Sequence, residues 1–488
     1  MHWILFVLGF TLYLIVRYRV APITQTPAWL LWFVLMIPAF IMGIWTVLYG
    51  DSQSLPQGLL VVSFVFSALS YILLVQAGRK PTPSANPDQE KAPGITPEPS
   101  KPKKVLDSQE ESQLQHCFPW SIYYLQKIDY RPQAVICRGQ LRSDPAVAYQ
   151  TIRENIQGQF GERFLILFQS NQPDQPYFAL VPNPQRQRQG QSQGMQYAIV
   201  ALLLVTTLLT TTLAGLSMAQ PDLDPQQLIK TPTLLQQGLP YGLALMAILG
   251  VHEMGHFLAA RYYRLKASLP FFIPSPFFLG TFGAFIQVRS PIPNRRTLFD
   301  VGIAGPLAGL LATLPFLLWG LVHSEVVPVP TSETALPTQA FDPKASFLFF
   351  LFCKVIYGAQ LGLEQRIDLH PVAIAGGLGL LVTALNLMPV GQLDGGQMVH
   401  AMFGQRQAAL IGHVSRLLLL LLSLIQPSLL LWSIFLLFMP VVSQPALNDV
   451  CELNDARDLL GLVSLALLLA IILPMPTGLA SFFALAHP

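Results

Sequence analysis

The sequence predicts a polytopic α-helical membrane protein that carries a small soluble α/β domain between its third and fourth spans. Three observations lead to this fold class. Hydrophobic residues make up 52% of the 488 residues and charged residues only 11%, a composition too apolar for a soluble globular protein. Apolar runs of membrane-spanning length recur along the chain. One region of balanced polarity interrupts them.

The apolar runs predict about ten transmembrane helices, because a span needs about 20 predominantly apolar residues and fewer where polar residues anchor its ends. The candidate spans are residues 3–16, 28–49, 58–77, 195–218, 239–262, 300–322, 372–390, 407–425, 428–443 and 458–474. The first run lacks a basic stretch before it and a small-residue cleavage site after it. We therefore expect it to be a retained anchor.

Composition divides the chain into five regions. They are an N-terminal three-span membrane module (1–77), a Pro-rich linker (78–106), a soluble α/β domain (107–182), a Gln/Arg-rich tether (183–194) and a second membrane domain (195–488). Proline-rich and polar stretches without apolar periodicity are typical of linkers. In the soluble domain, the pattern predicts strands at 133–141, 163–170 and 177–182 and a helix at 145–158.

Charge and cysteine usage narrow the possible partners. The net charge of +3 gives no electrostatic argument for a nucleic-acid partner, and we expect none. The four cysteines are scattered without CxxC spacing, so they predict neither a disulfide framework nor a thiolate zinc site.

The distribution of Lys and Arg predicts the orientation in the membrane. Basic residues follow the first, third and fifth spans and precede the sixth: Arg17, Arg19, Arg79, Lys80, Arg261, Arg264, Lys266, Arg295 and Arg296. Cytoplasmic loops carry such an excess. One orientation satisfies all of these positions, with the N-terminus outside and the soluble domain in the cytoplasm.

A candidate metal site lies in the fifth span, in "LGVHEMGHFLAARYYRLK" (249–266). His252 and His256 are separated by one helical turn and share a helix face, so both can bind one zinc ion. Glu253 lies about 100° round the helix, where it can reach a metal-bound water and take its proton. Ionisable residues inside a membrane are functional by default.

The third ligand of such a site has to come from another span, and "NLMPVGQLDGG" (386–396) supplies Asp394. Gly395 and Gly396 would let the backbone turn tightly and bring the carboxylate close, and Pro389 would end the preceding helix. A carboxylate that only caps a helix end is the alternative. The two motifs meet only if 345–363 does not cross the membrane, and Lys354 already makes that stretch a poor span.

Residues 269–288, "LPFFIPSPFFLGTFGAFIQV", predict a re-entrant β-like element, because prolines break any helix and the second half alternates like a strand. An interfacial loop is the alternative. In "GIAGPLAG", Gly302, Gly305 and Gly309 favour close helix packing. We expect His400 and His413 to be solvated or interfacial.

The combination of HExxH with NxxPxxxLDGG in separate spans resembles the site-2 protease family of intramembrane zinc proteases, and "FDVGIAGPLAG" (299–309) and "LGTFGAFIQV" (279–288) are similar to family segments. The stretches "GQLR" (139–142) and "DLHPVAIAG" resemble the cyanobacterial and chloroplast EGY-type branch. That branch has a related GNLR motif, from which Gln140 departs.

The resemblance implies that His252, His256 and Asp394 bind one Zn²⁺ per chain and that Glu253 is the general base. It implies that Asn386 holds substrate or the oxyanion, with a helix–helix hydrogen bond as the alternative. The β-like element, with Gly280 and Gly283, would pair with an unwound substrate strand. Family members cleave membrane-embedded helices of other proteins. The expected location is therefore a bilayer, either the plasma or the thylakoid membrane of a cyanobacterium.

Two rival functions remain open from the sequence. A transporter would distribute polar residues over several spans, whereas this chain concentrates them in two. A catalytically silent scaffold of the same fold would usually have lost Glu253 or a ligand, and all are present. The substrate, the role of the soluble domain and the oligomeric state are not determined by the sequence.

The predicted topology can be tested with a tag or a single cysteine label placed near residue 366. Because 345–363 should return to the side from which it started, the label should be accessible from the outer face. Labelling from the cytoplasmic side would contradict the shared site of Asp394 and the histidines.

Overall fold

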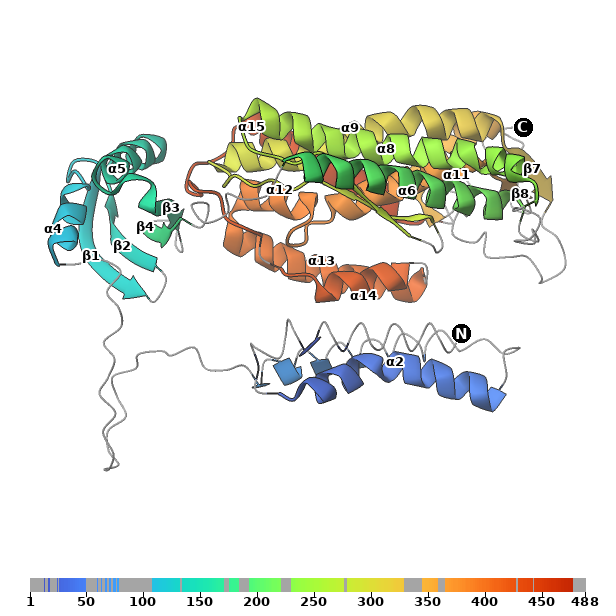
Figure 1. Ribbon diagram of the computed structural model, residues 1–488, viewed down its shortest axis with the longest axis horizontal. Helices are drawn as coiled ribbons and strands as arrows, with labels where there is room; N and C mark the ends of the chain where they lie inside the picture. Colours follow the sequence, from blue (N-terminus) through green and yellow to red (C-terminus); the bar gives the residue numbers. More distant parts are fainter. Residues whose placement is uncertain are drawn as a thin grey trace. The chain divides into compact units, whose positions relative to one another are not determined.

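Helices dominate the membrane regions, because a backbone in hydrocarbon has to satisfy its polar groups within the segment. The computed structural model describes residues 26–49, 108–131, 134–170, 175–183, 193–220, 230–275, 279–328, 345–358, 365–426, 429–441 and 443–476, with single positions between 13 and 24 and between 59 and 78 (Figure 1). Most of the predicted spans 3–16 and 58–77, the linker after Gly78 and most of the tether lie outside the described residues.

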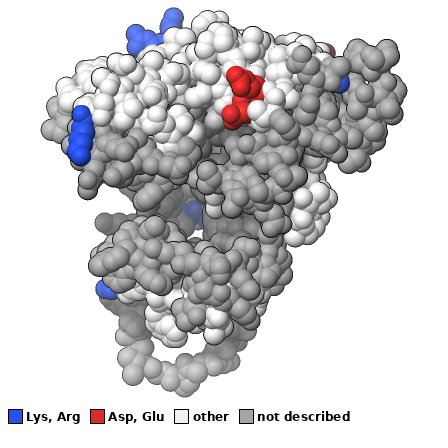
Figure 2. Space-filling view, turned by 90° about the vertical axis from the view of Figure 1, so that its right-hand side faces the viewer, with Lys and Arg blue, Asp and Glu red and all other residues white. Residues whose placement is uncertain are grey.

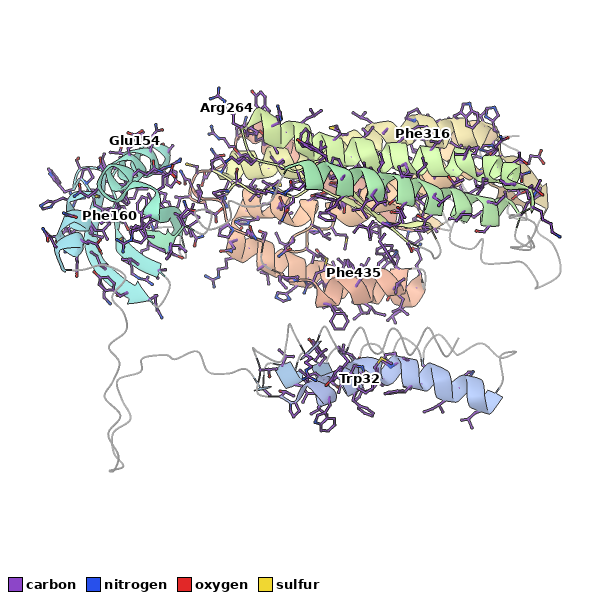
Figure 3. The ribbon with its side chains drawn as sticks, viewed as in Figure 1. Trp32, Glu154, Phe160, Arg264, Phe316 and Phe435 are labelled. Carbon is purple, nitrogen blue, oxygen red and sulfur yellow. The ribbon has the colours of Figure 1, made fainter. Side chains whose placement is uncertain are left out.

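The chain forms two units. One comprises Met1–Ser100 with Val414–Met439, and the other comprises Lys101–His413 with Pro440–Pro488. In the first unit, helix α2 (Ala28–Tyr49) accepts a hydrogen bond at the Val34 carbonyl from Ser67 Oγ, at 2.8 Å. Trp32, labelled in Figure 3, lies edge-on to Phe40 in the same helix.

Five described helices are long and apolar enough to cross a membrane, by length and composition. They are α2, α6 (Gln193–Ala219), α8 (Leu235–Tyr262), α9 (Arg295–Val322) and α13 (Gln405–Ile425). The apolar helix α11 (Pro371–Leu387) is shorter, and α15 (Asp455–Ile472) has Asp455 and Asp458 in its first turn. The predicted span 428–443 contains the nine-residue helix α14 (Leu430–Phe438), which at about 14 Å cannot span hydrocarbon alone.

In the second unit, α8 packs against α6, α9 and α11 (Figure 1). Small residues allow α6 and α8 to approach closely, because a Cβ added at Gly238 would lie 2.0 Å from the Thr212 carbonyl oxygen. The outer helix faces expose large apolar side chains such as Leu202, Leu243 and Leu311, as lipid contact requires. The face drawn in Figure 2 shows few charged side chains among its described residues.

The segment between α9 and α11 returns to its starting point. Strand β7 (Glu325–Pro328) follows α9, strand β8 (Gln365–Asp368) precedes α11, and the two pair antiparallel. Between them, α10 (Phe347–Tyr357) has 11 residues, about 16 Å, which is too short to cross. The prediction that 345–363 does not carry the chain to the opposite end of the bundle is therefore confirmed.

The proline-rich stretch after α8 forms a β-hairpin. Strands β5 (Phe271–Pro274) and β6 (Thr281–Phe285) pair antiparallel, which confirms the predicted β-like element. Side chains of the neighbouring helices hold its turn: Thr210 Oγ1 donates to the Gly280 carbonyl at 2.6 Å, and Tyr241 Oη donates to the Leu279 carbonyl at 3.1 Å.

The soluble α/β region contains an antiparallel sheet of order β1-β2-β4-β3. Its strands are β1 (Tyr123–Arg131), β2 (Ala134–Leu141), β3 (Phe164–Ser170) and β4 (Pro176–Pro182), and its helices are α4 (Ser108–His116) and α5 (Pro145–Phe160). The predicted strands and helix are confirmed. Strand β1 was missed, because "YYLQKIDYR" places Lys, Asp and Arg among its apolar residues.

The core of this region lies between α5 and the sheet. Tyr123, Ile152, Phe168 and Phe178 are all fully buried there, and the rings of Phe168 and Phe178 stack at 4.2 Å. On α5, Glu154 is exposed while Phe160 packs against this core (Figure 3). Burial, with a smaller contribution from the neighbouring Cys117, raises the pKa of the Cys137 thiol to about 12.

Close packing of α6 and α8 predicts opposite effects for two alanine substitutions in α8. Gly238→Ala should lower the thermal midpoint in detergent by several degrees, because overpacking costs about 1–3 kcal/mol. Gly250→Ala is the control, since its Cβ would make an ordinary 3.6 Å contact with Phe272 and alanine favours a helix. Equal midpoints for the two variants would contradict the packing.

Candidate metal centre

Helix α8 carries three ionisable side chains into the apolar bundle. His252, Glu253 and His256 are 2%, 7% and 6% exposed. The two imidazoles project from successive turns of one face, with ring centroids 5.1 Å apart. Such groups are costly in hydrocarbon unless they are paired or bind a metal.

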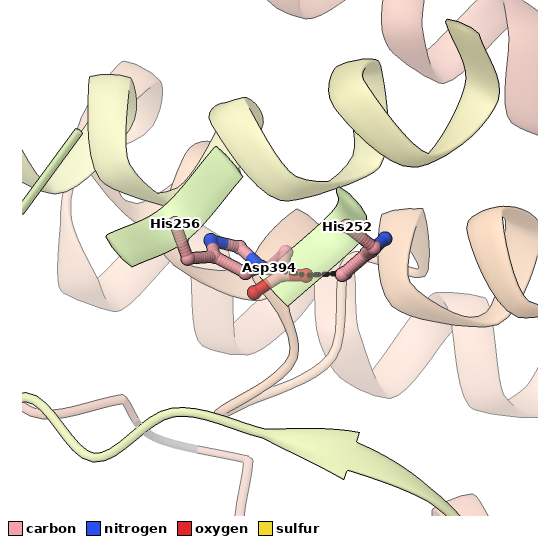
Figure 4. Close-up of side chains that lie close together, drawn as sticks. All are labelled: His252, His256 and Asp394. Atoms are coloured by element: carbon pink, nitrogen blue, oxygen red, sulfur yellow. Dashed lines mark hydrogen bonds and ion pairs between the residues drawn. The ribbon is translucent and has the colours of Figure 1, made fainter. Parts of the chain in front are cut away.

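The carboxylate of Asp394 meets both histidines from the first residue of α12 (Asp394–Phe403). Its Oδ2 lies 3.1 Å from His256 Nε2 and 3.5 Å from His252 Nε2 (Figure 4). Ligand atoms around a tetrahedral zinc ion are about 3.3 Å apart, given bonds of about 2.0–2.1 Å. Both the spacing and the two-nitrogen, one-oxygen donor set therefore fit zinc.

A hydrogen bond fixes which nitrogen of His256 faces the site. Nδ1 lies 2.7 Å from the Val301 carbonyl oxygen. Because a carbonyl only accepts, Nδ1 donates its proton there, which leaves Nε2, 3.1 Å from Asp394 Oδ2, as the nitrogen that could bind a metal. Metal-binding histidines are commonly oriented by a backbone carbonyl in this way.

Glycines of α9 form the wall behind the imidazoles. A Cβ added at Gly305 would lie 2.0 Å from His256 Nε2, and one at Gly309 would lie 2.7 Å from His252 Nδ1. A Cβ at Gly302 would lie 3.3 Å from the Asp394 carbonyl oxygen. The close helix packing expected of "GIAGPLAG" is therefore confirmed, and its partners are α8 and α12.

The chain between α11 and α12 delivers Asp394 through a turn. Helix α11 ends at Leu387, two residues before Pro389, and Gly391 takes a φ of +52°. The tight turn is therefore at Gly391, whereas Gly395 and Gly396 are helical, which corrects the predicted turn position. Gly395 serves close packing, since its Cβ would lie 1.9 Å from the Leu387 carbonyl oxygen.

Asn386 and Glu253 are polar side chains beside the cluster, and each has a different partner. The Asn386 amide nitrogen lies 3.0 Å from His252 Nε2, so Asn386 both links α11 to α8 and reaches the metal-facing nitrogen. The Glu253 carboxylate lies within hydrogen-bonding reach of the Ile286 backbone, directly after β6.

Gly280 and Gly283 lie in the hairpin and not in the metal cluster. Both have positive φ, at +79° and +107°. Gly280 packs against α6, since its Cβ would lie 2.4 Å from Thr211 Cα, whereas a Cβ at Gly283 would meet open space.

The interpretation of His400 as solvated or interfacial was wrong. His400 is fully buried and contacts Asp449, 49 residues further along the chain, at 3.0 Å. A pair at this separation leaves no periodic signal in the sequence, although a histidine at position 400 of an apolar helix was itself a hint. His413 is exposed, as expected.

The glycine wall predicts that Gly305→Ala empties the site. Its Cβ would collide with the rigid imidazole of His256, so zinc content measured by mass spectrometry should fall to a small fraction of one ion per chain. Gly302→Ala is the graded control, because a 3.3 Å contact needs only a small shift. Full zinc content in Gly305→Ala would contradict this geometry.

Comparisons with known proteins bear on the same residues. The family model described as "Peptidase family M50" matches residues 241–423, which include all three candidate ligands and Glu253. The description "EGY3 middle domain" matches residues 112–189, the soluble α/β region. No solved structure matches the chain.

Three plant relatives are similar over much of the chain. "Probable zinc metalloprotease EGY2, chloroplastic" of Arabidopsis thaliana is 31% identical over 70% of this chain and 60% of its own length. "Probable zinc metalloprotease EGY1, chloroplastic" of Oryza sativa subsp. japonica is 33% identical over 58% and 52%. "Probable zinc metallopeptidase EGY3, chloroplastic" of Arabidopsis thaliana is 26% identical over 75% and 66%.

The chain thus spans about half to two thirds of the length of these relatives. Both regions that match family models coincide with the parts that carry HExxH, Asp394 and the GQLR stretch. Residues 241–423 thus belong to the site-2 protease family, peptidase family M50, and the chain resembles the EGY-type relatives over both regions.

Proposed function

We propose that this chain is a zinc-dependent endopeptidase that hydrolyses peptide bonds within transmembrane segments of other membrane proteins. The observation that carries the proposal is the convergence of His252, His256 and Asp394, within 4.8 Å of one another, beside a buried Glu253. Among the described residues, these are the three His, Cys, Asp or Glu side chains that lie close enough together to hold one metal ion. A zinc hydrolase needs a metal site that activates water and, beside it, a base that takes the proton of that water.

One Zn²⁺ per chain would be held by His252, His256 and Asp394. The ion would supply Lewis-acid chemistry and a hydrolytic water at neutral pH. Glu253 takes the proton from the attacking water and delivers it to the leaving amide nitrogen, as a general base and then a general acid. With His252 Nε2 bound to the ion, the Asn386 amide N–H would be released from that nitrogen. It would then donate to the substrate carbonyl oxygen and stabilise the negative charge that develops there.

The substrate class follows from the surroundings of the centre. A scissile bond in a transmembrane helix is shielded by its hydrogen bonds, so the substrate has to be held in an extended form. The β5–β6 hairpin runs up to the general base and exposes Ile273, Phe282 and Phe285, which are 39%, 74% and 47% exposed. An unwound apolar segment would add to this hairpin as a further strand.

We place the centre toward the cytoplasmic side of a plasma or thylakoid membrane of a cyanobacterium. Arg261 in the last turn of α8 and Arg264 and Lys266 just after it support that side. Arg264, at this end of α8, is labelled in Figure 3. The relatives are named as chloroplastic, which favours the thylakoid. The partners of the protein would be substrate helices and the surrounding bilayer.

Two substitutions separate binding from chemistry. Glu253→Gln should retain about one zinc ion per chain and lose cleavage of a transmembrane model substrate by a factor of at least about 10² to 10⁴. Asp394→Ala should lose both zinc and cleavage, because it removes a ligand. The measurements are metal content of the purified protein and cleavage after reconstitution.

The same experiment decides between the proposal and its rivals. Zinc bound by the wild type without cleavage of any transmembrane substrate would favour a silent scaffold. Wild type without zinc, or full cleavage by Glu253→Gln, would contradict the proposed mechanism. Metal flux into vesicles that depends on Asp394 would favour a transporter.

A further inference from the structure

One loop contacts both the soluble region and the helices that form the metal centre. Residues 443–451 lie within the connection from α14 to α15 and contain no helix or strand. The loop belongs to the same unit as the soluble region and the α8–α12 bundle. Its backbone and its side chains make different contacts, and together they connect the two regions.

The backbone of the loop extends the soluble sheet. Strand β3 is an edge strand, and Phe168 at its centre exchanges two hydrogen bonds with the loop. The Phe168 amide donates to the Leu447 carbonyl at 2.6 Å, and the Asp449 amide donates to the Phe168 carbonyl at 2.9 Å. The side chain of Leu447 is part of the buried core of the soluble region, so the loop is integral to that domain.

The other edge of the loop pairs with the chain that leads into α9. The Leu447 amide donates to the Ile292 carbonyl at 2.8 Å, and the Asn448 amide donates to the Pro293 carbonyl at 2.9 Å. The next residue, Asn294, caps α9 by accepting from the Thr297 amide at 2.9 Å. The soluble sheet is therefore continuous, through one loop, with the start of the helix that carries the glycine wall.

Side chains of the loop hold α12 as well. His400 lies six residues after Asp394 on α12, and its imidazole is fully buried. Its Nδ1 lies 2.5 Å from Ser443 Oγ, and its Nε2 lies 3.0 and 3.1 Å from the two oxygens of Asp449. Arg295 Nε lies 3.6 Å from the same carboxylate.

We infer that the soluble domain positions the metal centre, through Leu447–Asp449 and the buried His400–Asp449 contact. The inference rests on the proposed zinc site. The loop fixes both α9, which forms the wall behind the imidazoles, and α12, which begins at Asp394. A short helix is rigid, so a rotation of α12 at His400 moves the carboxylate of Asp394 relative to His252 and His256. His400 and Asp449 are positioning residues, not catalytic ones.

Thermodynamic linkage gives this inference a consequence that does not depend on activity. If the docked soluble domain favours the arrangement that binds zinc, then zinc must favour the docked domain by the same factor. Zinc should therefore slow backbone amide exchange in residues 164–170 and 443–451, far along the chain from the ligands. A loop that serves only as an anchor would show no such response.

The test is hydrogen–deuterium exchange of the full chain in nanodiscs, with zinc and after chelation. Exchange in 164–170 and 443–451 should slow about threefold or more when zinc binds. Asp449→Asn should bind zinc about tenfold more weakly, as expected for energetic coupling of this kind. It should also lower kcat with little change in KM, and lose the zinc-dependent slowing. Glu452→Gln is the matched control, because Glu452 is an exposed acidic residue directly after the loop. This variant should behave as wild type.

Each result is decisive. Zinc bound to the wild type with unchanged exchange in both segments would overturn the inference and leave the proposed function intact, and this comparison requires no variant to fold. Wild-type zinc affinity in a folded Asp449→Asn protein would also overturn it. Failure of the wild type to bind zinc would contradict the proposed function itself, and the inference with it.

Discussion

A carboxylate on one helix has to meet two imidazoles on another inside an apolar bundle, and much of the structure follows from that requirement. Asp394, His252 and His256 are each stable there only as partners of one another or of a metal. Their approach needs α11 to end early, the chain to turn at Gly391, and α12 to pack against the end of α11. The six-residue segment between the two helices, with Pro389 and Gly391, meets all three needs.

Close approach of helices is the second constraint, and it explains the glycines of α9. In hydrocarbon, helix association depends on packing and not on removal of apolar surface from water. Gly305 and Gly309 face the imidazoles so closely that a methyl group would overlap them. The same residues therefore bring α8 and α9 together and leave room for the two imidazoles beside Asp394.

Much of this arrangement could be predicted from the sequence. The helix period places His252 and His256 on one face, Pro389 ends α11, and the prolines near 270 exclude a helix in favour of the hairpin. These are local signals. The number of spans was less well defined, because length and hydropathy do not separate a nine-residue apolar helix such as α14 from part of a longer span.

The contacts that the sequence could not reveal join distant segments. Strand β1 is polar on its exposed positions, so its place in the sheet depends on pairing with β2. His400 looked like a surface residue because its partners, Ser443 and Asp449, lie more than 40 residues away. Such pairs follow from tertiary packing, to which neither periodicity nor motif spacing is sensitive.

The most direct test of the account is zinc K-edge X-ray absorption on the purified protein, because it reports the ligand atoms themselves. The account predicts nitrogen and oxygen scatterers at about 2.0–2.1 Å, with two imidazoles and one carboxylate, and no sulfur at about 2.3 Å. A thiolate shell, or a six-oxygen shell typical of a loosely bound ion, would contradict the central claim that HExxH and Asp394 build one zinc site.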